Sequence, residues 1–323
     1  MTRLPSTVLA SLIVIAGVLG GSPSSSGRAV AATAQEAEPE TVDPERFGQR
    51  QPDRAFGAFQ RGLYITALNL ALPRAKEGDP AAQTLVAEIY ARGLGIARDE
   101  KEAAHWYAEA AGNGVPEAQF QYALMLLDGR FVEADADQAY KLMEKAADAG
   151  NPMAQFNYAQ MVLERESGVW AQEKAVAYFQ LAADSGLPDA QYAMAEIYAQ
   201  GVGGTAKDEK RARDMLVRAA RQNYDTAQLM LGTWLVEGIG GEKNLEAGFQ
   251  WLQRAAQSGN VAAQNRLAKL YWFGLGTEGD SIRAAAWYIK ARRAGLFDRE
   301  LELLLDGLTP EEQREAIQAA NRL

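Results

Sequence analysis

The chain has 323 residues, of which 48% are hydrophobic, and a formal net charge of −9. This composition is typical of a folded protein, and the negative charge disfavours nucleic acid as a partner because its phosphates repel an acidic surface. The chain has no cysteine and a single histidine, His105. Thiolate zinc sites, thiol catalysis and disulfides are therefore excluded, and we expect neither a metal site nor a cofactor.

The N-terminal segment has the layout of a secretory signal peptide. Arg3 precedes an uncharged apolar run at Val8–Leu19, and small-residue motifs follow at Ala29–Ala34. The run is shorter than the roughly 20 residues that cross a bilayer. We predict a cleaved signal peptide at residues 1–34, and hence a periplasmic or secreted protein without a membrane span; an uncleaved N-terminal anchor is the alternative. Residues 35–52 are acidic and contain proline, which predicts a flexible linker.

A repeat of about 36 residues occupies most of the remaining chain. The dipeptide Ala-Gln recurs at spacings of 36 or 37 residues, with its glutamines at Gln83, Gln119, Gln155, Gln191, Gln228 and Gln264. A glycine stands five residues before each glutamine except one, where Asn223 takes its place. Self-similarity at this period indicates a stacked repeat protein.

Each repeat predicts two helices. Counted from the glutamine, large apolar residues recur at positions +3, +6 and +7, which is the spacing of one helical face. The first helix is expected to end at position +10, where five repeats have a glycine suited to a left-handed cap: Gly93, Gly129, Gly201, Gly238 and Gly274. The third repeat has Arg165 there, so we expect its loop to differ. The second helix starts after a capping residue such as Asp208 or Asn244.

This pattern resembles the Sel1-like repeat, a relative of the tetratricopeptide repeat. The resemblance rests on the Ala-Gln-x-x-Leu-Ala-x-x-Tyr run in AAQNRLAKLY, the Gly-x-Gly in YWFGLG and the Trp-Tyr-x-x-Ala-Ala run in AAHWYAEAAGNG. It implies an all-α fold, a right-handed superhelical solenoid of antiparallel helix pairs that serves as a docking scaffold. The array is expected over residues 78–295, between capping helices at 53–77 and 296–323. Thr309 and Glu312 predict the start of a helix in the second cap.

The repeated glutamine is predicted to be structural. On a helical wheel it lies inside the apolar arc, and a buried amide needs hydrogen-bond partners. We expect each glutamine side chain to bond to the backbone around a neighbouring turn.

Position +1 of the first helices predicts a partner-binding surface. In tetratricopeptide-type arrays the first helix of each pair lines the concave face, and the resemblance places position +1 there. Apolar residues at +1 of the middle repeats and acids at +5 form the predicted site: Phe120, Phe156, Tyr192, Leu229, Glu88 and Glu196. Such a column favours a protein or peptide partner with Lys or Arg between apolar anchors. The alternative is that the next repeat covers these residues.

Nothing in the sequence singles out a catalytic residue. The Gly-x-Gly motifs follow helices, whereas phosphate-binding loops follow strands, and His105 precedes the core pair Trp106 and Tyr107 and so is expected to face solvent. We therefore predict a monomeric, non-enzymatic interaction scaffold of the bacterial envelope. A hydrolase or binder of envelope glycan is the alternative, and paired acids among stacked aromatic residues would favour it.

Overall fold

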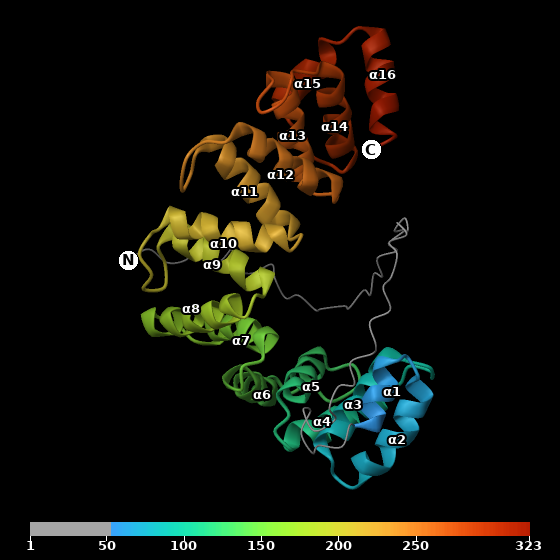
Figure 1. Ribbon diagram of the computed structural model, residues 1–323. Coiled ribbons are helices and arrows are strands. Elements are labelled where there is room, and N and C mark those ends of the chain that lie inside the picture. The colour runs from blue at the N-terminus through green and yellow to red at the C-terminus, as the bar shows by residue number, and fades with distance from the viewer. Residues whose placement is uncertain (1–52) are drawn as a thin grey trace, which may run out of the picture. The chain divides into compact units, whose positions relative to one another are not determined.

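The computed structural model describes residues 53–323, so the predicted signal peptide (1–34) and linker (35–52) lie outside the described residues. The described part of the chain holds sixteen α-helices and no strand (Figure 1). It divides into two compact units, one up to Ala110 and one from Ala111 onward. Within residues 53–323, no helix combines the length and the apolar content that crossing a bilayer requires. The predicted all-α fold of tandem helix pairs is confirmed.

The first unit holds a helical cap and the first repeat. Its helices are α1 (Arg54–Gln60), α2 (Tyr64–Lys76), α3 (Pro80–Arg92) and α4 (Glu100–Gly112), the last of which reaches the unit boundary. The helix α2 packs between α1 and α3, so α1 and α2 cover one end of the first repeat.

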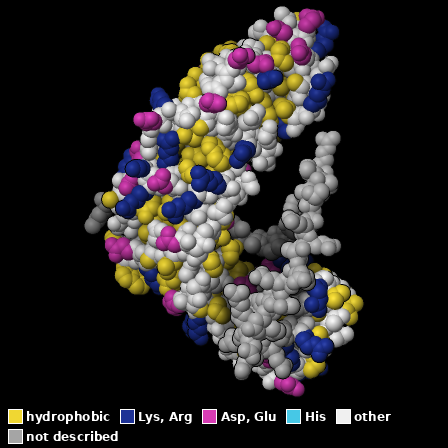
Figure 2. Space-filling model, in the orientation of Figure 1, with side chains coloured by type: hydrophobic (Ala, Val, Ile, Leu, Met, Phe, Trp, Pro, Cys, Tyr) yellow, Lys and Arg dark blue, Asp and Glu magenta, His cyan; other side chains and the backbone are white. Residues whose placement is uncertain are grey.

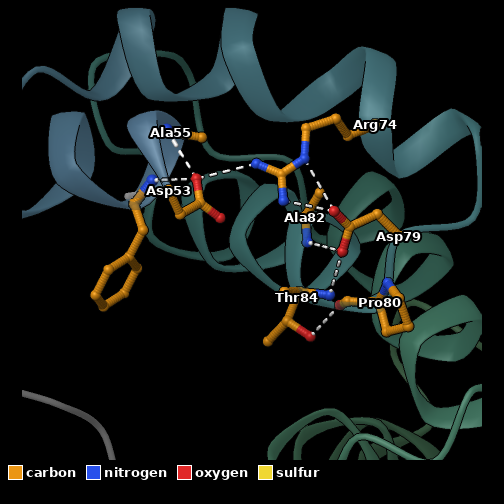
Figure 3. A network of polar contacts seen from close by, with 9 residues as sticks. Asp53, Ala55, Arg74, Asp79, Pro80, Ala82 and Thr84 are labelled. Carbon is orange, nitrogen blue, oxygen red and sulfur yellow. Dashed lines mark hydrogen bonds and ion pairs between the residues drawn. The ribbon is translucent and has the colours of Figure 1, made fainter. Parts of the chain in front are cut away.

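A polar network joins the helix ends of this unit (Figure 3). Asp53 caps α1 by accepting from the N–H groups of Ala55 and Phe56, and Asp79 caps α3 in the same way. Arg74 of α2 reaches both acids, with Nη1 3.0 Å from Asp53 Oδ1 and Nη2 2.5 Å from Asp79 Oδ2. The hydrogen bond from Arg74 lowers the pKa of Asp53. Burial raises the pKa of Asp79, but its hydrogen bonds outweigh burial and the pKa is lowered.

The second unit is a stack of helix pairs closed by two further helices. The pairs and the closing helices are α5 (Pro116–Asp128), α6 (Ala136–Asp148), α7 (Pro152–Arg165), α8 (Val169–Asp184), α9 (Pro188–Gln200), α10 (Glu209–Arg221), α11 (Asp225–Glu237), α12 (Leu245–Gln257), α13 (Val261–Phe273), α14 (Ser281–Arg293), α15 (Arg299–Asp306) and α16 (Pro310–Ala320). From α7 to α13, each first helix packs against its own second helix and against the second helix of the preceding pair. This two-sided packing decides which residues a partner can reach.

The recurring glutamine lies in the core of every repeat. All six glutamine side chains are between 1% and 6% exposed. Each donates from Nε2 to the backbone carbonyl oxygen eight residues earlier, at 3.0–3.3 Å. Gln155, for example, donates to Ala147 in the last turn of α6. The bond spans the turn between consecutive repeats, which is the kind of backbone partner that we expected.

The helix ends follow the predicted caps. The five predicted cap glycines adopt the left-handed conformation, with φ between 62° and 82°. Asn223 is the only non-glycine residue with positive φ among residues 53–323, at 64°, because it replaces a turn glycine. Thr309 and Glu312 form the predicted capping box. In the third repeat α7 runs to Arg165, and the chain leaves it extended at Glu166 (φ −109°, ψ 155°).

Candidate docking site

The predicted apolar column is covered by neighbouring helices. Phe120, Phe156 and Tyr192 are only 4%, 2% and 8% exposed. The ring of Phe156 packs edge-on against Phe179 of α8, with ring centroids 5.5 Å apart. A helix packed from two sides buries a wider arc than the one-sided stripe of a surface helix. These aromatic residues therefore serve packing, and the intact fold does not present the three rings as a contact surface.

The other three residues of the predicted site differ from one another. Leu229 is half-buried and packs against the core cluster at the C-terminal end of the array. Glu88, in the first unit, accepts from Arg92 Nη1 at 2.8 Å and from the Tyr107 hydroxyl at 3.1 Å, so its charge is already paired. Glu196 of α9 accepts from the Tyr192 hydroxyl at 3.0 Å. In the described part of the chain no Lys or Arg forms an ion pair with Glu196.

Two further residues join Glu196 in a tyrosine–carboxylate cluster, which comprises Asp189, Tyr192, Glu196 and Tyr224. Asp189, Tyr192 and Glu196 lie on one face of α9, three and then four residues apart. Tyr224, which precedes α11, brings its ring to 5.5 Å from that of Tyr192. Asp189, like Glu196, has no ion pair to a described Lys or Arg. The cluster thus combines two half-buried acids with two aromatic rings and no cation.

The electrostatics of this cluster follow from burial. Burial raises the pKa of Glu196 and of Asp189 above the usual range of a carboxyl group. Burial and the nearby carboxylates of Asp189 and Asp225 raise the pKa of Tyr224 to about 12. A partly desolvated carboxylate without a cation destabilises the fold when it is ionised, and such perturbed groups gather at functional sites.

Sequence reasoning selected Tyr192 and Glu196 but missed Asp189 and Tyr224. Tyr224 stands four residues before Gln228, where the first and third repeats have the capping residues Asp79 and Asn151. It makes no side-chain cap for α11. A bulky aromatic residue at a capping position was the signal that could have identified it.

A second candidate lies between the second and third repeats. A pocket of about 280 Å³ is lined by Asp137, Tyr140, Lys141, Arg165 and Glu166. The guanidinium of Arg165 pairs with Asp137 and lies 4.8 Å from the centroid of the Tyr140 ring. The Tyr140 hydroxyl donates to Glu166. The pocket walls are therefore polar and aromatic, with charges of both signs.

On the face shown in Figure 2, neither positively nor negatively charged side chains predominate. Lys and Arg side chains intersperse with Asp and Glu side chains there, and apolar side chains gather between them (Figure 2). Mixed charge does not steer a partner from a distance, so recognition on this face depends on local sites.

Models of the Sel1 repeat match residues 80–115, 116–151, 152–187, 188–224, 225–260 and 261–296. The chain belongs to the Sel1 repeat family. Arrays of this family are generally protein–protein interaction scaffolds. The six matched segments coincide with the helix pairs from α3–α4 to α13–α14.

Solved structures share this fold. A Sel1 repeat protein from Oxalobacter formigenes is 32% identical, with a TM-score of 0.61 over 76% of this chain and 71% of that chain. The protein c5321, a protective antigen of uropathogenic Escherichia coli, is 26% identical, with a TM-score of 0.57 over 80% of this chain and 64% of that one. Chitin synthase regulatory factor 3 of Schizosaccharomyces pombe is 36% identical over 80 residues, which are 24% of this chain and 9% of the relative.

Proposed function

We propose that this Sel1 repeat protein is a non-enzymatic docking scaffold, and that its tyrosine–carboxylate cluster receives a Lys or Arg side chain of a protein partner. The observation that carries the proposal is the pair of half-buried acids, Asp189 and Glu196, that have no ion pair to a described Lys or Arg and lie beside two tyrosine rings.

A cation fits this cluster chemically. The ammonium or guanidinium group of a partner would neutralise carboxylates that burial has made costly to ionise. It would also meet the face of Tyr224, and a cation over an aromatic ring gains about 0.5–2 kcal/mol. Truncating one partner of such a buried charge pair costs about 2–5 kcal/mol of binding. The cluster would therefore act as an anchor for one basic residue of the partner.

The glycan alternative also calls for acids among aromatic rings. Sugar rings, however, stack on exposed aromatic faces, and Tyr192 is 8% exposed. The cluster offers carboxylates and the half-buried ring of Tyr224 rather than a flat platform. This geometry favours a basic side chain over a glycan.

The test is a selection of random dodecapeptides displayed on phage against the full chain. We expect the selected peptides to contain Lys or Arg beside apolar residues. Binding of these peptides should fall at least tenfold for Glu196→Gln and for Asp189→Asn, because each variant removes one acid from the anchor. Glu164→Gln, which removes an exposed acid of α7, is the matched control and should bind normally. Selected peptides without basic residues, or unchanged binding by both cluster variants, would contradict the proposal.

We further propose that the scaffold works in the bacterial envelope, in the periplasm or outside the cell. The N-terminal pattern of Arg3, the apolar run Val8–Leu19 and the small residues at Ala29–Ala34 supports this proposal. N-terminal sequencing of the protein from the native cell should find a mature chain that begins between Ala32 and Gln35. An intact Met1 on protein from the cytoplasmic fraction would exclude it.

A further inference from the structure

Three basic residues recur at one position of the second helices in the last three repeats. Arg218 of α10, Arg254 of α12 and Lys290 of α14 follow one another at intervals of 36 residues. Arg218 and Arg254 are exposed, and Lys290 is half-buried. Because stacked repeats place equivalent residues side by side, the three side chains form successive rungs on one side of the array. We call this set the basic ladder.

The basic ladder has no counter-charge among the described residues. The last two turns of the three helices, residues 215–221, 251–257 and 287–293, contain no acid. Arg292, which is not part of the ladder, lies 3.0 Å from Glu302, but no ladder residue forms an ion pair with an acid in residues 53–323. Three uncompensated cations thus lie together in a chain whose net charge is −9.

Two of the three rungs rest on tryptophan rings. The guanidinium carbon of Arg254 lies 5.1 Å from the centroid of the Trp251 ring, and Lys290 Nζ lies 5.6 Å from that of Trp287. A cation is attracted to the face of an aromatic ring, so each contact restricts the rotamers of a long side chain. A side chain that is already ordered loses less entropy when it binds a partner.

The helix dipole does not account for the ladder. Basic residues near the C-terminus of a helix are favourable because the helix dipole is negative there. The equivalent residues of α4 and α8, however, are Glu109 and Leu181. These second helices form without a cation at this position, so the fold does not require one.

We propose that the basic ladder is a further docking surface, and that it binds an extended acidic segment of a protein partner with one carboxylate at each rung. The inference goes beyond the proposed function, since it concerns a different surface and a partner group of opposite charge from those of the tyrosine–carboxylate cluster.

The spacing of the rungs suits an extended chain. Because α10 and α12 both pack against α11, and packed helices lie about 8–10 Å apart, the axes of α10 and α12 are at most about 20 Å apart. The same holds for α12 and α14, which both pack against α13. An extended chain covers such a distance with about three to six residues. At each rung a carboxylate can accept charge-assisted hydrogen bonds from the cation.

The surroundings of the ladder favour a protein segment over an anionic lipid surface. The last two turns of α10, α12 and α14 expose no large apolar side chain. Stable attachment to a lipid surface takes an apolar anchor in addition to basic residues. An acidic peptide needs no such anchor, since each of its carboxylates can reach one cation of the ladder.

The experiment measures binding of a fluorescent peptide, EGSGEGSGE, to the full chain by fluorescence anisotropy at low salt. We expect saturable binding with a Kd of about 1 mM, because exposed ion pairs contribute little individually. Binding this weak does not compete in the phage selection that tests the tyrosine–carboxylate cluster. The peptide GSGEEEGSG has the same composition with its acids adjacent. It should bind about threefold more weakly, because its carboxylates cannot reach separate rungs.

Variants of the chain test each part of the ladder. Arg218→Gln, Arg254→Gln and Lys290→Gln together should weaken binding of EGSGEGSGE at least tenfold, while circular dichroism shows the native helix content. Lys145→Gln removes an exposed cation at the equivalent position of α6 and is the matched control, which should bind normally. Leu181→Arg adds a rung on α8 and should strengthen binding of the longer peptide EGSGEGSGEGSGE about threefold.

Several results would overturn the inference. These are equal binding of the spaced and adjacent peptides, unchanged binding by the triple variant, and a loss in Lys145→Gln as large as in Arg254→Gln. Binding of phosphatidylglycerol vesicles that depends on the ladder, without binding of EGSGEGSGE, would assign the ladder to a lipid surface and would also overturn it. Glu196→Gln should bind EGSGEGSGE normally, so failure of the ladder and failure of the tyrosine–carboxylate cluster are distinguishable.

Discussion

Both the nitrogen and the oxygen of the Gln191 side-chain amide form hydrogen bonds, whereas only the nitrogen of the Gln155 amide does. Each side chain donates to a carbonyl eight residues earlier, but only Gln191 also accepts, from Gln222 Nε2 at 2.9 Å. The Oε1 atom of Gln155 is buried without a partner. We predict that Gln191→Leu lowers the free energy of unfolding by about 1–3 kcal/mol, because a buried carbonyl loses its donor. Gln155→Leu should cost less, because it also removes an unsatisfied acceptor.

Urea denaturation of both variants measures this difference. Gln138→Leu, at an exposed position of α6, is the control and should change stability by less than about 0.5 kcal/mol. Equal free energies of unfolding in urea for wild type and Gln191→Leu would show that the glutamine bonds contribute nothing to the stability of the array.

Glu196 is expected to reduce stability at neutral pH. Because burial raises its pKa, its contribution to stability is fully present below the unfolded pKa and is lost as the pH rises through the folded pKa. Glu196→Gln should therefore raise the thermal midpoint at pH 7, and the gain should shrink toward about pH 4. Thermal melts at several pH values test this, and a variant less stable than wild type at pH 7 would contradict it.

Among the elements, α7 shows how two-sided packing changes the role of a residue. Phe156 is 2% exposed against α8, so Phe156→Ala should destabilise the fold by about 3–5 kcal/mol, as core Phe truncations do. The sequence pattern places Phe156 on a partner-binding surface, where truncation would cost less stability than in the core, but Phe156 and the core residue Tyr158 are equally buried, at 2% and 0% exposed. Chemical denaturation of Phe156→Ala and Tyr158→Ala should give similar losses. A Phe156→Ala loss below about 1 kcal/mol would show that the ring is not part of the core.

The ends of α1, α2 and α3 depend on Arg74. The lowered pKa values of Asp53 and Asp79 mean that their contribution to stability is present above the unfolded carboxyl pKa and is lost as the pH falls through the folded values. Arg74→Met should destabilise the first unit by about 1 kcal/mol or less at pH 7, because these side chains are partly solvated. The difference from wild type should vanish in acid.

Amide hydrogen exchange in α1–α3 measures the effect of Arg74→Met locally. Arg92→Met, which breaks only an i,i+4 pair with Glu88, should have a smaller effect. Equal exchange rates in wild type and the Arg74 variant at pH 7 would mean that the network does not hold the helix ends together.

At the scale of the whole molecule, features that depend on a few consecutive residues could be predicted from the sequence. Features that depend on packing between helices could not. Helix ends could be predicted because a cap such as Gly201, Asn223 or Thr309 acts within a few residues. The side of a helix that is exposed to solvent could not be predicted, since it depends on how many helices pack against that helix. The cluster joins Tyr192 to Tyr224, one repeat away, and the pocket joins Tyr140 of α6 to Arg165 at the end of α7.

The alternation of glutamine-bonded turns and glycine loops has a consequence for length variation. The length of the turn is fixed, because a residue inserted between a glutamine and the carbonyl eight positions before it would move the side-chain amide away from its acceptor and break the bond. The loop is not fixed, because the chain itself has three residues in one loop and eight in another. The one spacing of 37 residues arises beside that eight-residue loop, at Gly201–Asp208. Insertions of tags or foreign epitopes should therefore be tolerated in the loops within the repeats and not in the turns between them.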